Sequence, residues 1–131
     1  MKKLFISVPM KNRTEENIRK SIEKMHKMAE LVFEEELEVI PSYVEDKPPK
    51  DSKEAIWYLG KSIQKLAEAD YFIGIHWSDT FKGCNLERQV AFDYGIKVHM
   101  VDHCLFFPDV AEIERKNRNY VEGTCVRGEL Q

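Results

Sequence analysis

The sequence predicts an α/β fold in which helices cover both faces of a parallel sheet of four or five strands. Four short apolar runs, at 4–8, 37–40, 71–75 and 97–101, alternate with longer segments whose apolar residues recur every three or four positions. This alternation requires right-handed crossovers, which leave the strands parallel and both faces covered. The length of 131 residues fits one domain, 1–131, with the first strand at its centre.

The first strand and the first helix are marked by their ends. The run 4–8 stops at Pro9, which gives up a ladder hydrogen bond. We expect Thr14 to cap the next helix, because Glu15 and Glu16 in the first turn favour the positive end of the helix dipole. Apolar residues then follow at helical spacing: Ile18, Ile22, Met25, Ala29, Val32 and Phe33.

The next two strands enclose the second helix. After the strand 37–40, the loop 41–50 contains Pro48 and Pro49 and continues neither a helix nor a ladder. We expect Ser52 to cap a helix that leads directly into the strand 71–75. Its apolar face carries Ile56, Leu59, Ile63 and Leu66.

The third helix begins at Gly83 and buries Leu86 and Val90, and Gly95 is the expected left-handed stop before the strand 97–101. Pro108 begins a last helix with Val110 and Ile113 turned inward. The core therefore spans about 3–101. Residues 102–131 show no firm period beyond that helix, and a short fifth strand there is an open alternative.

Composition excludes several classes of protein. The chain has 20 basic and 23 acidic residues and a net charge of −3, so it lacks the general field that captures polymeric nucleic acid. Three cysteines without redox or metal spacing, and an N-terminal apolar run too short for a signal peptide, indicate a reduced, cytoplasmic protein. No apolar stretch approaches the roughly 20 residues that cross a bilayer, so no membrane association is expected.

Polar and aromatic residues gather in the loops that follow the first three strands. Because open α/β sheets bind ligands at the carboxyl edge of their strands, these loops should form one crevice. Aromatic faces beside carboxylates suit a nucleobase and a sugar. The base stacks on an aromatic ring, and the carboxylates stabilise the positive charge that develops at the anomeric carbon. The residues expected there are Ser7, Pro9, Met10, Arg13, Ser42, Tyr43, Trp77, Asp79, Gly83, Asn85 and Glu87.

Glu87 is the strongest catalytic candidate. It lies about one turn into the third helix, where free backbone N–H groups and the helix dipole favour an ionised carboxylate, the form that attacks an anomeric carbon. The alternative is that Glu87 only caps its helix. Arg13 also has two interpretations, because an arginine before a helix either helps to hold a phosphate or is a solvated loop residue.

Two further candidates for chemistry have weaker support. Cys84 at the head of the third helix could be a nucleophile of lowered pKa, but no histidine is fixed near it by the sequence. His99, His103 and Cys104 lack a second pair of ligands at metal-site spacing. We expect neither a metal nor a redox cofactor.

Three segments, in a fixed order, carry a resemblance to a known family. They are FISVPM at 5–10, LAEAD at 66–70 and GCNLE at 83–87, the last continuing through Ala91 to Gly95. Together they resemble small nucleoside 2-deoxyribosyltransferase-like proteins and their nucleotide N-glycosidase relatives over about residues 3–101. The resemblance implies a flavodoxin-like, Rossmann-like three-layer sandwich, a glutamate nucleophile at Glu87 and an aspartate at Asp70 that assists departure of the base. Asp70 could equally cap the end of the second helix.

The sequence departs from the transferase pattern at two places. The transferases carry an aspartate two residues before the glycine, where this chain has Phe81, so that Asp79 is the nearest acid. They also often carry a tyrosine in the first strand that orients the nucleophile. Here that strand offers no tyrosine, and Tyr43 is the candidate substitute.

These observations predict an enzyme that cleaves or exchanges the N-glycosidic bond of a deoxynucleoside or its 5′-monophosphate. Glu87 would attack the anomeric carbon, and Asp70 or Asp79 would protonate the leaving base. Because the family often completes its site from a neighbouring subunit, we expect a homodimer or a higher homo-oligomer. The alternative is a binding module that keeps the nucleotide crevice without turnover, as a sensor or sequestering protein.

Overall fold

The computed structural model of the chain describes residues 1–42, 44–76, 80–102 and 106–125, with side chains as far as residue 117. The strands are β1 (Lys2–Ser7), β2 (Leu37–Val39), β3 (Tyr71–Ile75) and β4 (Lys97–Val101). The helices are α1 (Glu15–Phe33), α2 (Glu54–Leu66), α3 (Lys82–Asp93) and α5 (Pro108–Cys125). Strands and helices alternate along the chain as predicted.

The described strands form one sheet in the order β2-β1-β3-β4, and every pair is parallel. This is the strand order of flavodoxin-like folds. The prediction of a parallel sheet with the first strand inside it is confirmed. The alternative of a fifth strand is not realised in the described residues 106–125, of which Pro108–Cys125 form α5.

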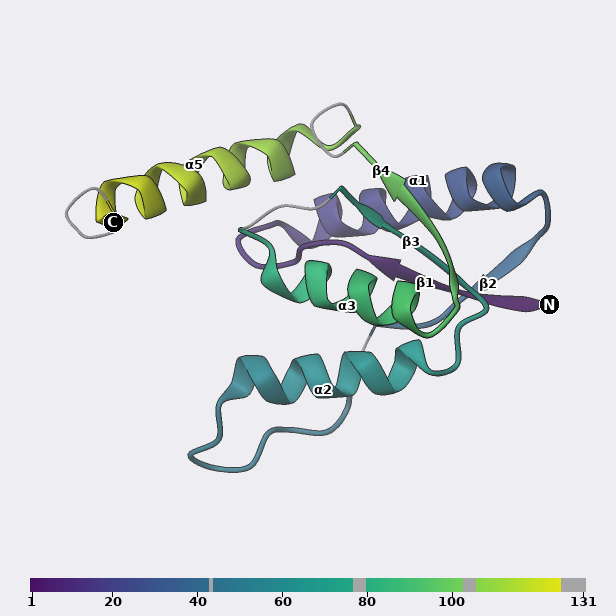
Figure 1. Cartoon of the computed structure of the whole chain (residues 1–131), viewed down its shortest axis with the longest axis horizontal. Coiled ribbons are helices and arrows are strands. Elements are labelled where there is room, and N and C mark those ends of the chain that lie inside the picture. The colour runs from purple at the N-terminus through teal and green to yellow at the C-terminus, as the bar shows by residue number, and fades with distance from the viewer. Residues whose placement is uncertain (43, 77–79, 103–105, 126–131) are drawn as a thin grey trace.

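Helices cover both faces of the sheet, which gives three layers (Figure 1). On one face, Met25 of α1 and Val110 of α5 pack with Leu4 and Ile73. On the other, Leu66 of α2 and Ala91 of α3 pack with Phe5 and Phe72. The neighbouring β1 residues Leu4 and Phe5 thus pack against helices on opposite faces of the sheet, because successive side chains of a strand alternate between faces. This alternation decides where each polar residue of the strands points.

Most helix ends agree with the sequence-based expectations. Thr14 caps α1 by accepting a hydrogen bond from the backbone N–H of Asn17 at 3.1 Å, and Gly95 follows α3 with a φ of 82°. The expected cap of α2 is wrong. That helix begins after Lys53, while the Ser52 hydroxyl donates to the Pro49 carbonyl at 2.6 Å and closes a turn in the preceding loop.

Within the described residues, no helix has the length and apolar character needed to span a bilayer.

The predicted inward side of α5 is confirmed, since Val110 is fully buried and Ile113 packs against the same cluster. In Figure 1, α5 extends past the sheet on the side where the β1–α1 loop and the first turn of α3 lie. The carboxyl edge of the sheet is therefore bounded by several elements.

Candidate active site

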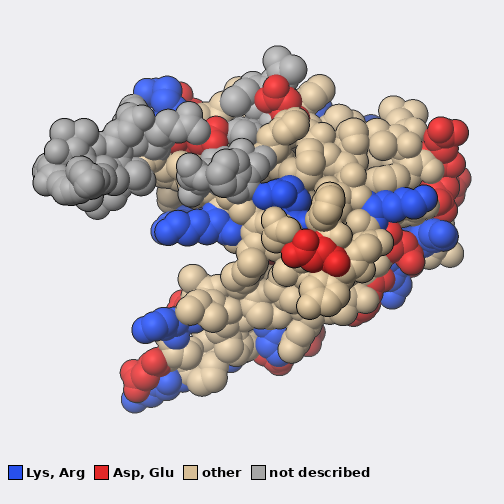
Figure 2. All heavy atoms as spheres, viewed as in Figure 1, with Lys and Arg blue, Asp and Glu red and all other residues tan. Residues whose placement is uncertain are grey.

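A cavity of about 570 Å³ lies at the carboxyl edge of the sheet. Its walls come from the end of β1 and the loop that follows, from residues 40–42 and 44, from α2, from the start of α3 and from α5. Figure 2 shows the molecule hollowed on this side, with lysine or arginine side chains at the border of the hollow. The volume is in the range that holds a small-molecule ligand.

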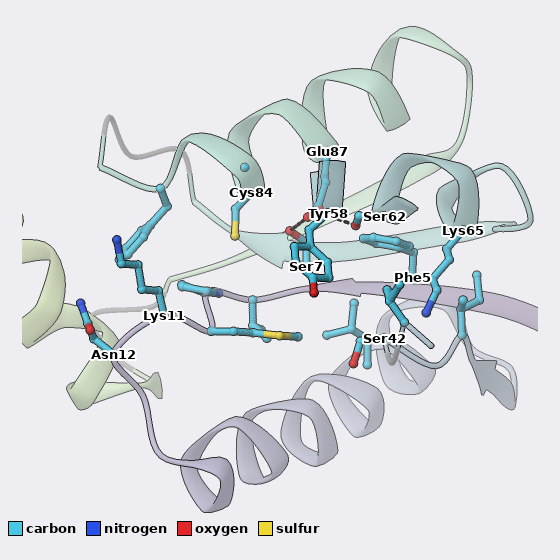
Figure 3. Close-up of a pocket in the computed structure, with 18 of the residues that line it drawn as sticks. Phe5, Ser7, Lys11, Asn12, Ser42, Tyr58, Ser62, Lys65, Cys84 and Glu87 are labelled. Carbon is cyan, nitrogen blue, oxygen red and sulfur yellow. Dashed lines mark hydrogen bonds between the residues drawn. The ribbon is translucent and has the colours of Figure 1, made fainter. Parts of the chain in front are cut away.

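Glu87 lies in the cavity with two hydroxyl groups bound to its carboxylate. Ser7, the last residue of β1, donates to Oε1 at 2.6 Å. Ser62 of α2 donates to Oε2. Ser7 points this way because it shares a strand face with Phe5, toward α2 and α3. The carboxylate is thus fixed from two sides, as the dashed lines in Figure 3 show.

Burial raises the pKa of Glu87 above its usual value of 4.5, while the hydrogen bonds from Ser62 and Ser7 lower it in part. The helix dipole does not supply the stabilisation expected from the sequence. Because α3 begins at Lys82, Glu87 is its sixth residue, beyond the first turn in which the dipole acts. The capping alternative also fails, since the N-cap of α3 is Phe81 and no side chain caps it.

Cys84 lines the same cavity one turn before Glu87. Burial raises the pKa of its thiol to about 12, and the nearby Glu87 carboxylate adds to this. The thiol therefore stays protonated at neutral pH, which contradicts the interpretation of Cys84 as a nucleophile of lowered pKa.

The rest of the lining is mainly apolar, with a few uncharged polar residues and two cationic ends. Figure 3 shows Lys11 near one end of the cavity and Lys65 near the other, with Glu87 between them. Lys65 Nζ also donates to the Pro41 carbonyl at 2.8 Å. Among the described lining residues Glu87 is the only carboxylate, so two lysines and one glutamate leave a net charge of +1. Such a cavity favours an anionic ligand with an apolar part.

The structure brings several predicted residues together and separates others. Ser7, Pro9, Met10, Ser42 and Gly83 line the cavity with Glu87. Asn85 lies on α3 outside the lining. Tyr43, Trp77 and Asp79 fall outside the described residues. Groups of three or more His, Cys, Asp and Glu side chains that could hold a metal are absent from the described part of the chain.

Asp70 lies at the opposite edge of the sheet, which is inconsistent with a role at this site. It precedes β3, where its carboxylate accepts from the Lys3 N–H at 2.8 Å and its own N–H donates to the Lys3 carbonyl at 2.9 Å. The five residues of β3 separate it from the carboxyl edge, which is roughly 16 Å at about 3.3 Å per residue. Asp70 therefore ties β3 to β1 and is too far to protonate a base beside Glu87.

Arg13 is neither a phosphate ligand of the cavity nor a solvated loop residue. Only 1% of its side chain is exposed, and it forms an ion pair with Asp109 at 2.7 Å. Its guanidinium also donates to the Pro9 carbonyl at 3.0 Å and to the Ser21 hydroxyl at 2.6 Å. Its donors are occupied by protein groups and its side chain does not line the cavity, so it is not available to a ligand there.

Sequence reasoning missed the contribution of α2. Tyr58, Ser62 and Lys65 all line the cavity. Their spacing of four and three residues places them on one helix face, a signal that was present in the sequence but concealed by the stronger apolar stripe beside it. Ile113 and Asn117 of α5 also line the cavity, and no pattern in the sequence indicated this for Asn117.

Comparison with known proteins bears on the fold. No family model matches the sequence, and no curated protein matches it significantly. The structure is similar to the crystal structure of a conserved protein from Enterococcus faecalis V583, with a TM-score of 0.51 and 15% sequence identity. The match covers 75% of this chain and 61% of that protein, so it spans less than two thirds of the latter. The likeness shows the fold alone, and the chain adopts a flavodoxin-like, Rossmann-like three-layer α/β fold.

Proposed function

We propose that this protein cleaves or exchanges the N-glycosidic bond of a deoxynucleoside or its 5′-monophosphate, with Glu87 as the nucleophile. The observation that carries the proposal is the Glu87 carboxylate, bound by two hydroxyl groups within a cavity of about 570 Å³. The resemblance of three segments to nucleoside 2-deoxyribosyltransferase-like proteins supports the same chemistry.

The reaction is a double displacement. One oxygen of ionised Glu87 forms a bond to the anomeric carbon while the bond from that carbon to the base nitrogen breaks, and the base leaves with a proton. Water or a second base then attacks the same carbon, the ester bond breaks and the Glu87 carboxylate is regenerated. Two inversions give overall retention. Ser7 and Ser62 hold the carboxylate in place during attack and stabilise its charge when it departs.

The proton for the leaving base needs a donor other than Asp70, whose position excludes it. Asp79 remains the predicted donor and lies outside the described residues. Phe5 and Tyr58 offer ring surface for the base, and the two lysines offer positive charge to a 5′-phosphate.

A homodimer is part of the proposal, because α2 is only partly covered within one chain. Leu66 at its end is buried, but Ile56 is 64% exposed and Tyr58 43% exposed. A second copy seated on this half of α2 would cover both and complete the cavity wall beside Tyr58. Sedimentation at micromolar concentration should show two or more chains per particle, and a strict monomer would contradict this part of the proposal.

The activity is tested by incubating the protein with a panel of deoxynucleosides and their 5′-monophosphates, with and without a free second base, and separating the products. We expect hydrolysis or base exchange with the wild type and none with Glu87→Gln. Glu38→Gln is the matched control, since Glu38 is exposed on β2 and does not line the cavity. Comparable turnover by wild type and Glu87→Gln would show that the nucleophile is assigned wrongly.

One observation favours the second candidate, a nucleotide-binding module without turnover. Among the described residues of the lining no second carboxylate accompanies Glu87, and Phe81 stands where the transferases carry an aspartate. Binding of nucleotides by calorimetry, without any product from the panel, would establish this function in place of the enzymatic one.

A further inference from the structure

Arg13 connects the loop 9–12 and α1, which flank it in the sequence, to α5, where its partner Asp109 lies 96 residues away. Its Nε and Nη2 atoms bind both carboxylate oxygens of Asp109, at 2.7 and 3.1 Å, in the first turn of α5. Nη2 also reaches the Ser21 hydroxyl of α1 at 2.6 Å, and Nη1 reaches the Pro9 carbonyl at 3.0 Å. A planar guanidinium suits this task, because its donors point in fixed and different directions.

Two of these three segments are walls of the cavity. Pro9 opens the loop 9–12, and every residue of that loop lines the cavity. Its backbone is closed by a hydrogen bond from the Arg13 N–H to the Met10 carbonyl at 3.3 Å. Asp109 lies one turn before Ile113 and two turns before Asn117, the residues that α5 adds to the lining. The third segment, α1, is anchored in the core through Met25 and Ala29.

We propose that Arg13 is a positioning residue that sets the shape of the cavity by fixing the loop 9–12 and α5 to α1. The ion pair supplies the fixed geometry, since a carboxylate bound through both oxygens resists rotation. The Arg13 and Asp109 side chains are only 1% and 30% exposed, so salt screens the attraction between them less than it screens a surface ion pair. When the ion pair is broken, α5 and the loop are held together less closely and the interior of the cavity becomes more accessible than in the wild type.

The rate at which the Cys84 thiol is alkylated measures the accessibility of the cavity, and this measurement needs no substrate. Cys84 lines the cavity and packs against the apolar cluster that contains Val110 and is contacted by Ile113. Burial raises the pKa of the Cys84 thiol to about 12, so iodoacetamide should modify this thiol slowly in the wild type. Digestion and peptide mass measurement would separate its modification from that of Cys104 and Cys125.

The experiment compares the alkylation rate of Cys84 in four folded variants. Asp109→Asn and Ser21→Ala weaken the Arg13 contacts, and we expect Asp109→Asn to raise the rate at least about tenfold, the factor expected when one charge-assisted hydrogen bond is lost. Glu112→Gln on the same helix removes only an exposed pair with Arg115 and should leave the rate unchanged. Leu37→Ala destabilises the core at a buried residue that does not line the cavity and should change the rate less than Asp109→Asn does.

An unchanged rate in both Asp109→Asn and Ser21→Ala would overturn the proposal. So would an equal increase in Leu37→Ala, because the thiol would then report global unfolding. If turnover is found, Asp109→Asn should raise KM more than it lowers kcat. The alkylation result stands whether or not a substrate is found, so failure of this proposal and failure of the proposed function are distinguishable.

Discussion

Replacing Gly74 by alanine should destabilise the protein by about 2 kcal/mol, because a new methyl group would overlap a buried ring. A Cβ at this position would lie 2.8 Å from Cε1 and 3.2 Å from Cζ of Phe72. Carbon atoms in contact are normally about 3.5–4.0 Å apart, so the overlap is roughly 0.7 Å or more. Phe72 is fully buried and stacks on Phe5 with ring centroids 5.7 Å apart, so the ring has little room to move.

The assay is urea unfolding of wild type and variant, with the free energy of unfolding extrapolated to water. Gly60→Ala is the matched control. Gly60 is an exposed residue inside α2, and a Cβ there meets nothing within 4 Å. Alanine should therefore stabilise the protein by about 0.5–1 kcal/mol through its helix propensity.

The two substitutions should change stability in opposite directions. A Gly74→Ala protein as stable as the wild type would refute the packing argument. The clash is with the Phe72 ring alone, because a Cβ would lie 3.5 Å from that of Ser7, its partner in the sheet, which is an ordinary contact.

Three further predictions follow from burial and charge. Glu87→Gln should stabilise the protein relative to wild type above pH 4.5. Because the pKa of Glu87 is raised in the folded state, folded wild type keeps the Glu87 proton to higher pH than the unfolded chain does, and its free energy of unfolding falls as pH rises from 4.5 through the raised pKa. Thermal unfolding of both proteins at a series of pH values checks this. Ser62→Ala removes a hydrogen bond that lowers the pKa of Glu87, so the Glu87 carboxyl titration followed by NMR should move to higher pH. Leu4→Ala should cost about 2–5 kcal/mol of unfolding free energy, whereas Leu31→Ala, 78% exposed, should change it by less than about 0.5 kcal/mol.

The fold was predictable because the inner strand β3 is buried on both sides. All five residues of β3 are buried, so the run 71–75 had to be almost wholly apolar. The positions of Ser7 and Glu87 were also predictable, since the end of a strand and the start of the next helix are local features that topology brings to one edge.

The contacts that complete the site depend on packing between elements that the local sequence does not place relative to one another. Ser62 reaches Glu87 only because α2 packs beside α3 on the same sheet face. Arg13 was misassigned because its partner, Asp109, lies 96 residues away. Asp70 matches the family pattern in sequence, but it precedes β3, and the direction of that strand places it at the amino edge of the sheet.

The serine contacts of Glu87 also have a consequence for how the protein folds. They join residues 80 and 25 positions apart, and the sheet beneath them requires pairing of β1 with β3, whose partners, such as Leu4 and Tyr71, are also far apart in the sequence. Contacts of such long sequence separation form late, after much chain entropy has been lost. A ligand that needs all three side chains would bind only the complete native state and would raise the free energy of unfolding of the whole domain, by about 2.7 kcal/mol at a concentration of 100 times Kd. Thermal-shift screening of small anions and nucleosides would therefore detect the natural ligand class before any reaction product is known.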